Sequence, residues 1–244
     1  VMWLPTIFCG ITSFFALLAI FWKKLKAPLD FVEEDQPVKD KTLALLSGII
    51  LGVCTALIAA SSYVGLEMWL VALCGCAGLY LIAFFCSLIR KKGGEIAVSS
   101  LKRTPWQMVP LVVGMFVIVL ALVNTGATEK AALAIGSETP ILRYGTLSTL
   151  SANLFNNIPM SVLFSSIINC ADKTIFLKAV YSTVIGSNIG AFLTPLGALA
   201  GLMFLSIVKD NGVKTGFFEF VKYGAPVAVL SLASALAGLA IMLA

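Results

Sequence analysis

The chain alternates long stretches without charge with short stretches that carry its charged residues. Seven stretches contain no Asp, Glu, Lys or Arg: 1–22, 42–66, 68–89, 104–128, 144–171, 179–208 and 223–244. A helix needs about 20 mostly apolar residues to cross the hydrocarbon core of a bilayer, and every stretch reaches that length. Membrane β-barrels show instead segments of about 10 residues with alternating polarity. The pattern therefore predicts an all-α, polytopic transmembrane helical bundle.

Composition and charge agree with this prediction. Hydrophobic residues make up 59% of the chain and charged residues 12%, outside the usual range of a soluble domain. The net charge of +5 does not indicate nucleic-acid binding, because the basic residues cluster beside predicted helix ends in segments 23–41 and 90–103. Basic loops of multi-pass proteins lie on the cytoplasmic side. We therefore expect a protein of the cell inner (plasma) membrane with both segments in the cytoplasm.

The predicted organisation has two parts. Residues 1–41 read as a connecting transmembrane helix followed by a solvated cytoplasmic linker, and residues 42–244 read as a transporter repeat. A polar turn at 61–65 separates its first two helices, and a polar connection covers 129–143. The predicted elements of the repeat are helices 42–60, 68–89 and 106–124, a hairpin at 139–171, a broken helix at 178–208 and a helix at 222–243.

Two of the stretches, 144–171 and 179–208, are interrupted near their centres. The interruptions are 151–159 in the first, and 186–190 followed by 194–197 in the second. Proline removes an amide hydrogen bond and glycine lowers helix propensity. Asparagine side chains at this depth are costly without partners. Non-helical backbone is tolerated there only where protein buries it or where it lines a watery cavity.

A pair of such interrupted segments is the sequence pattern of a secondary transporter's substrate site. The alternative is that Pro159 and Pro195 merely kink two ordinary helices. Residues 144–171 could form a re-entrant hairpin or a full span. The number of basic residues on each side of the membrane differs too little between these two topologies to decide. Two half-helices of about 12–14 residues each fit a hairpin, which we therefore favour. The predicted substrate-binding residues are Asn153, Asn156, Asn157, Pro159, Gly186, Ser187, Asn188, Gly190, Thr194, Pro195 and Gly197.

At these positions the chain resembles the arsenite/antimonite efflux permeases of the ion-transporter superfamily. Segments 156–159, 186–190 and 194–197 match the order and spacing of that family's hairpin tip and following broken helix, and 104–117 is similar to the helix before the hairpin. The resemblance covers the whole chain but only the C-terminal half of a family member. It implies efflux of arsenite or antimonite, coupled to protons by alternating access. It also places Asn156 and Asn157 at the hairpin tip, opposite Asn188 and Thr194.

Other substrates stay open at this point. Sodium/proton antiporters and organic-anion carriers share similar breaks. A neutral oxyacid of trivalent arsenic or antimony suits a site of amides, hydroxyls and helix ends. Some relatives have an acidic residue where this chain has Asn188, and the chain has no His and no carboxylate in its charge-free stretches. Cys74 and Cys76 would suit thiophilic arsenic, but residues two apart point to different faces of a helix.

Enzyme activity is not expected. An intramembrane protease needs a Ser/His or an Asp pair, and these stretches hold neither His nor Asp; a channel is a further alternative. The six cysteines lie in apolar stretches and read as small hydrophobic residues, so we expect no disulfide framework, no metal and no cofactor. The expected partners are the inorganic solute, a coupling ion and the lipid bilayer.

Carriers of this kind are inverted repeats with the site between them. Each interruption occurs once in this sequence, which opens on Val1. We therefore expect a missing N-terminal half or a second chain to supply a mirrored hairpin, a mirrored broken helix and the carboxylate that couples protons.

Overall fold

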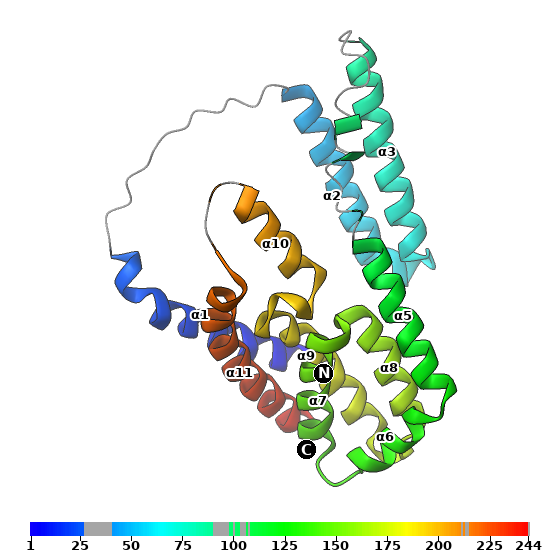
Figure 1. Cartoon of the computed structure of the whole chain (residues 1–244), viewed down its shortest axis with the longest axis vertical. Coiled ribbons are helices and arrows are strands. Elements are labelled where there is room, and N and C mark those ends of the chain that lie inside the picture. The colour runs from blue at the N-terminus through cyan, green and yellow to red at the C-terminus, as the bar shows by residue number, and fades with distance from the viewer. Residues whose placement is uncertain are drawn as a thin grey trace. The chain divides into compact units, whose positions relative to one another are not determined.

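The computed structural model describes residues 1–26, 41–89, 98–99, 101–102, 106, 108–210, 212 and 215–243. Every regular element within these residues is a helix (Figure 1), which confirms the predicted all-α fold. Within the described part of the chain, five helices are long and apolar enough to cross a membrane, or six if one bent pair counts as a span. The protein is therefore a multi-pass membrane protein. Most of segments 23–41 and 90–103 lies outside the described residues.

The chain divides into two units, residues 1–28 with 107–244 and residues 29–106. This division differs from the predicted boundary at residue 41. The first helix, expected to be a connector, belongs to the same unit as the two interrupted segments. The helices expected at 42–60 and 68–89 make up most of the other unit.

The smaller unit is an antiparallel pair of helices, α2 (Lys41–Val64) and α3 (Met68–Ile89). The thiol of Cys54 on α2 donates to the carbonyl of Val71 on α3 at 3.7 Å. α2 extends through most of the turn predicted at 61–65, and the Ser61 hydroxyl is satisfied within that helix by donating to the carbonyl of Ile58 at 2.7 Å. The chain reverses instead at Gly65, whose φ of 72° suits glycine.

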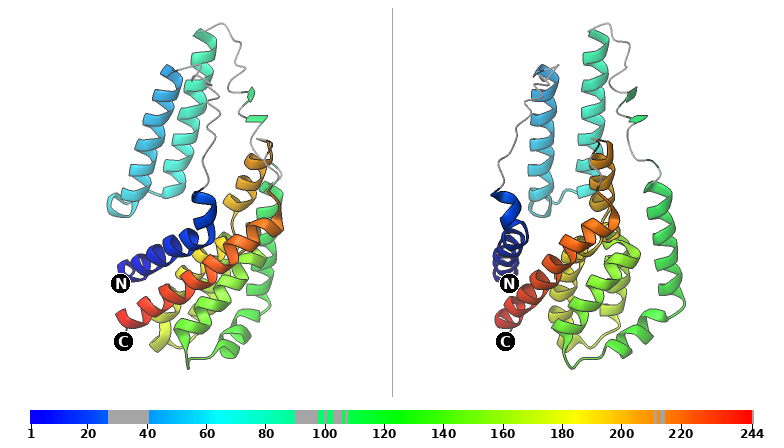
Figure 2. Two further views of the ribbon diagram at one scale, coloured as in Figure 1. Left: turned by 90° about the vertical axis from the view of Figure 1, so that its left-hand side faces the viewer. Right: turned by 60° about the vertical axis from the view of Figure 1, so that its left-hand side comes forward.

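In the larger unit, α1 (Trp3–Leu25) lies antiparallel to α11 (Phe217–Met242), as the left view of Figure 2 shows. The Ser13 and Ser231 hydroxyls are 2.7 Å apart, and the rings of Phe21 and Tyr223 are 5.1 Å apart. α11 begins five residues before the predicted start at 222. The aromatic and charged residues at 217–221 therefore form its first turn.

The connection expected at 129–143 contains a helix that the sequence reading missed. α5 (Met108–Asn124) is followed by α6 (Ala127–Ile135), and the pair is bent by 78°. The bend occurs at Gly126, whose φ of 71° is left-handed. α6 packs against the hairpin through Ala132 and Ile135.

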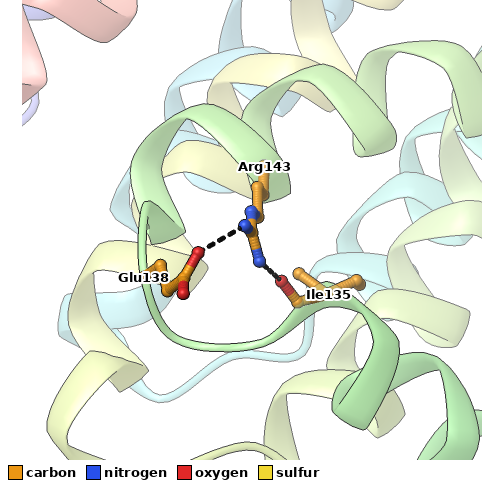
Figure 3. Close-up of polar contacts among 3 residues, drawn as sticks. All are labelled: Ile135, Glu138 and Arg143. Atoms are coloured by element: carbon orange, nitrogen blue, oxygen red, sulfur yellow. Dashed lines mark hydrogen bonds and ion pairs between the residues drawn. The ribbon is translucent and has the colours of Figure 1, made fainter.

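Arg143 fastens the segment between α6 and the hairpin. Its guanidinium donates to the carbonyl of Ile135, at the end of α6, at 2.6 Å and to the Glu138 carboxylate at 2.8 Å (Figure 3). The carbonyls of a helix's last turn have no partner within the helix. Arg143 therefore caps α6 from the first turn of the next helix.

The predicted hairpin consists of α7 (Pro140–Phe155) and α8 (Asn157–Asn169), with the single residue Asn156 between them. The residues before α7 (136–137) and those after α8 (170–172) line one pocket. A straight helix of about 30 residues would hold these ends about 45 Å apart. The chain therefore turns back at Asn156 instead of continuing.

The broken helix consists of α9 (Phe176–Leu193), a 3-10 turn η2 (Pro195–Gly197) and α10 (Leu199–Asp210), after a short turn η1 (Lys173–Ile175). α9 packs against both arms of the hairpin, and the two arms also contact each other. Along α7, contacts advance from Gly145 beside Gly186 to Asn153 beside Gly190, so the two helices run in the same direction.

Candidate functional site

The hairpin tip is a buried asparagine with a strained backbone. Asn156 has φ 66° and ψ 156°, a region that residues other than glycine rarely adopt and that costs roughly 1–3 kcal/mol. Its side chain is buried, and its amide nitrogen donates to the carbonyl of Leu196 in η2 at 3.4 Å. Its amide oxygen has no partner among the described residues. The tip therefore holds a free buried acceptor where the two breaks meet.

Asn153, one turn earlier on α7, joins the hairpin to the broken helix. Its amide nitrogen donates to the carbonyl of Gly190 at 3.0 Å, and its amide oxygen accepts from the Thr194 hydroxyl at 2.6 Å. Thr194 is extended (φ −140°, ψ 159°), so the chain leaves the helix just where the Gly190 carbonyl would accept from the amide four residues later. Asn153 supplies a replacement donor. Its role is therefore to hold the break.

Two glycines expected to break the second helix serve instead in packing. α9 runs without interruption through 186–190. A Cβ on Gly186 would lie 2.4 Å from the carbonyl oxygen of Gly145, and a Cβ on Gly190 would lie 2.9 Å from that of Thr149. Small residues four apart let two membrane helices approach closely. Gly186 and Gly190 therefore allow α9 to pack closely against α7, and the break begins only at Thr194.

The two prolines begin new elements and do not kink continuous helices. Pro159 is the third residue of α8, and Pro195 is the first residue of η2. Amides in the first turn of a helix have no acceptor within the helix, so proline loses nothing there. Gly197 completes the second break, because a Cβ there would meet the Gly190 carbonyl oxygen at 2.4 Å. The simple-kink alternative is therefore not what the structure shows.

A groove of about 370 Å³ lies between α8 and α9. Ser161 and Ser187 approach each other across it at 3.5 Å, and Asn169 shares the groove with Phe176 at the opposite end. α8 therefore runs antiparallel to α9. The polar side chains that line the groove are Ser161, Ser165, Asn169, Thr183, Ser187 and Asn188.

Thr183 has no hydrogen-bond partner for its hydroxyl among the described residues, although its side chain is 93% buried. An unsatisfied buried polar group costs roughly 1–3 kcal/mol. Thr183 lines the groove, but its hydroxyl oxygen is itself buried. Thr183 and the Ser187 beside it are four residues apart on α9, so they share one face.

The sequence reading found Ser187 and Asn188 but missed the rest of the groove. Ser161, Ser165 and Asn169 recur every four residues along α8, a spacing that puts them on one helix face. That spacing was the available signal.

The predicted residues therefore separate into two groups. Asn153, Asn156, Gly190, Thr194, Pro195 and Gly197 meet at the crossing of the two breaks, and Ser187 and Asn188 line the groove. Asn157 is half-buried at the start of α8, and its side chain makes no hydrogen bond to another described residue. Its carbonyl accepts from the Ser161 hydroxyl at 2.7 Å, which ties the tip to the groove. Asn188, exposed, donates to its own helix at 3.0 Å.

No charged side chain lines the groove among the residues that the structure describes. Hydroxyls and amides can both donate and accept hydrogen bonds, so the groove can bind a neutral solute that carries several hydroxyl groups. Among the described residues no group of three His, Cys, Asp or Glu could hold a metal ion. Cys74 and Cys76 are exposed on α3, in the other unit.

Comparison with known proteins gives one consistent result. The family model described as "arsenical pump membrane protein" matches residues 1–243. An arsenical pump membrane protein of Escherichia coli is 27% identical over 188 residues, covering 73% of this chain and 42% of the relative.

Two mycobacterial relatives also match. A 46 kDa membrane protein of Mycobacterium leprae is 28% identical over 216 residues, and an uncharacterized transporter of Mycobacterium tuberculosis is 26% identical over 218 residues. Each alignment covers 84% of this chain and 48% of the relative. The chain therefore spans about half the length of the curated relatives it matches. No solved structure matches it.

Proposed function

The chain belongs to the arsenical pump membrane protein family, and we propose that it contributes one wall of an efflux pathway for arsenite or antimonite. The observation that carries the proposal is the groove between α8 and α9, whose described polar lining consists of hydroxyl and amide side chains. The trivalent oxyacids of arsenic and antimony are neutral at pH 7 and carry several hydroxyl groups. They match a lining of hydroxyls and amides.

The meeting point of the two breaks supplies the inner end of this pathway. α8 begins there, so its first amides and the positive end of its dipole lie next to Asn156 and Asn157. In our proposal the hairpin is re-entrant: it enters the membrane, turns at Asn156 and leaves on the same side. Asn157 contacts the solute, and Asn153 keeps the break open.

Transport by alternating access requires a second wall that moves against the first. We propose that a mirrored repeat, preceding this one or on another chain, supplies that wall and the carboxylate that couples protons. The charge-free lining of the groove supports this division, because proton coupling needs a titratable group. In the proposed topology, segments 23–41 and 90–103 face the cytoplasm of the inner membrane.

The experiment measures uptake of arsenite into everted membrane vesicles from cells producing a transporter that contains this chain. Asn157→Ala should abolish uptake while the protein stays inserted and folded. Asn124→Ala, an exposed asparagine at the end of α5, is the matched control and should leave uptake unchanged. Normal uptake by a well-folded Asn157→Ala variant would remove Asn157 from the site.

Two companion measurements address the substrate and the second wall. Vesicles offered antimonite, sodium and citrate distinguish the metalloid carrier from a sodium/proton antiporter or an organic-anion carrier, the second candidate on this fold. A strong anion would need a cation in the lining, and the groove has none. Residues 1–244 reconstituted alone in liposomes should give no robust proton-driven arsenite flux; such flux would overturn the mirrored-repeat proposal.

A further inference from the structure

A second large pocket of about 570 Å³ opens between α1, α11 and the broken helix, away from the α8–α9 groove. Its lining changes in character along both long helices. On α1 it runs from Lys24 through Phe21 to Leu17, and on α11 it runs from Glu219 through Tyr223 to Val227. The two helices are antiparallel, so both charged residues lie at the same end. The pocket is therefore charged at one end and apolar beyond it.

The length of the pocket lining, from its charged end to its apolar end, matches the thickness of one bilayer leaflet. Lys24 and Ser13, at the two extremes of the α1 lining, are eleven residues apart, or about 16 Å along a helix. Half of a hydrocarbon core about 30 Å thick is about 15 Å. Aromatic residues gather at the charged end, as is usual at the membrane interface. The charged end therefore corresponds to the headgroup level and the apolar part to the acyl chains.

The two charges at the mouth have opposite signs. Lys24 and Glu219 both line the pocket, and no ion pair joins them within the described part of the chain. The Lys24 ammonium lies over the rings of Phe21 at 5.8 Å and Tyr223 at 5.4 Å. Lys24 thus supplies a cation and Glu219 an anion to one opening. An occupant with both charges satisfies both residues.

We propose that this pocket binds a zwitterionic phospholipid with a primary-amine headgroup, such as phosphatidylethanolamine. The phosphate would pair with Lys24, the ammonium would donate to Glu219, and one acyl chain would lie along Leu17 and Val227. A choline headgroup has no N–H for Glu219, and an anionic glycerol headgroup brings no cation to it. The observations therefore favour the primary amine.

The same pocket touches both parts of the broken helix. Phe192 lines it from α9 and Phe204 from α10, on either side of η2. The Phe204 ring also packs edge-on against Phe220 of α11 at 6.3 Å. A bound lipid would therefore contact both arms of the break and support their relative position.

Native mass spectrometry of the purified protein tests the proposal. The protein is released from nanodiscs that contain equal amounts of phosphatidylethanolamine, phosphatidylcholine and phosphatidylglycerol, and retained lipid is counted. We expect one phosphatidylethanolamine per chain. Lys24→Gln should lower its retention about tenfold, the effect of losing one hydrogen bond to a charged group. Glu219→Gln should shift the preference toward phosphatidylglycerol.

Matched controls separate this pocket from general headgroup adsorption. Lys222→Gln changes a lysine that lies over Tyr223 at 5.6 Å but outside the pocket lining, and Glu129→Gln changes an exposed carboxylate on α6; both should retain lipid normally. Leu17→Trp fills the apolar part and should reduce retention with both charges intact. The proposal is overturned if the three lipids are retained equally or if Leu17→Trp leaves retention unchanged. It is also overturned if the protein is released as a dimer without bound lipid, because a second copy of the chain would then cover the pocket.

Discussion

Replacing Asn153 by alanine is the sharpest test of how the two breaks are held together. The change removes the donor to the Gly190 carbonyl and the acceptor of the Thr194 hydroxyl. Gly190 is buried and Thr194 is extended, so this carbonyl has no replacement within its helix. The Thr194 oxygen keeps one contact, because it still accepts from the Leu196 amide at 3.3 Å.

The expected loss of stability follows from these contacts. Two neutral hydrogen bonds at about 1 kcal/mol each, plus about 1–3 kcal/mol for the desolvation of an orphaned carbonyl, give about 3–5 kcal/mol. For a chain of this size that lowers the melting temperature by about 10 °C. Asn157→Ala, which removes no hydrogen bond to another described residue, should change stability by less than about 1 kcal/mol.

The measurement is thermal unfolding of the purified protein in detergent, followed by circular dichroism at one fixed scan rate. A double-mutant cycle with Thr194→Val isolates the contact between the two side chains, and we expect a coupling of about 1 kcal/mol. The reasoning is refuted if Asn153→Ala melts with the wild type, or if the two substitutions are additive.

Four further predictions follow from the same contacts. Thr183→Val removes an unpartnered hydroxyl and should leave melting unchanged or slightly raised while slowing arsenite uptake; lower stability with normal uptake would show a purely structural role. Pro195→Ala restores an amide at the break and should slow turnover by changing the helix geometry, so an unchanged uptake rate would mean that the break does not depend on proline. Gly186→Ala should destabilise by at least about 1–3 kcal/mol because its Cβ meets the Gly145 carbonyl at 2.4 Å, whereas Gly10→Ala, with open space around it, should be neutral or stabilising in the same melts. The backbone amide of Thr174 donates to the Asp172 carboxylate and holds the pKa of that carboxylate below its ordinary value. The stability that this contact contributes is therefore lost as the pH falls through the lowered pKa. Asp172→Asn should reduce the difference between the melting temperatures at pH 6 and pH 3.

The apolar stretches and their interruptions were readable from the sequence, because membrane helices and helix breaks depend on local composition. The hairpin at Asn156 and the break at Thr194 and Pro195 could be predicted because residues in these segments continue a helix only at a cost in free energy. α6 was missed because its charged residues, Glu129 and Lys130, read as a connection. Whether such a short amphipathic segment forms a helix depends on the packing of Ala132 and Ile135 against the hairpin.

The roles within the candidate site were harder to predict than its position. Asn153, Asn156 and Asn157 look alike in sequence, yet their roles differ. Asn153 holds the break, Asn156 is the strained tip, and the Asn157 side chain makes no hydrogen bond to another described residue. Gly186 and Gly190 likewise read as helix breakers. Their role is decided by the approach of α7, which a single sequence does not show. The four-residue spacing of Ser161, Ser165 and Asn169 would have revealed the groove.

The backbone contact between α7 and α9 also determines which pieces of this fold can move. With Gly186 and Gly190 against the main chain of α7, neither helix can slide or rotate without steric collision, so the two behave as one rigid rod. α10, by contrast, follows the break, and its inner end is anchored by the close approach of Gly201 to Pro195. Amide hydrogen exchange should consequently be slow and concerted across α7 and α9 and much faster along α10. We therefore expect α7 and α9 to move as one unit and α10, beyond the break at Thr194, to be the more mobile element.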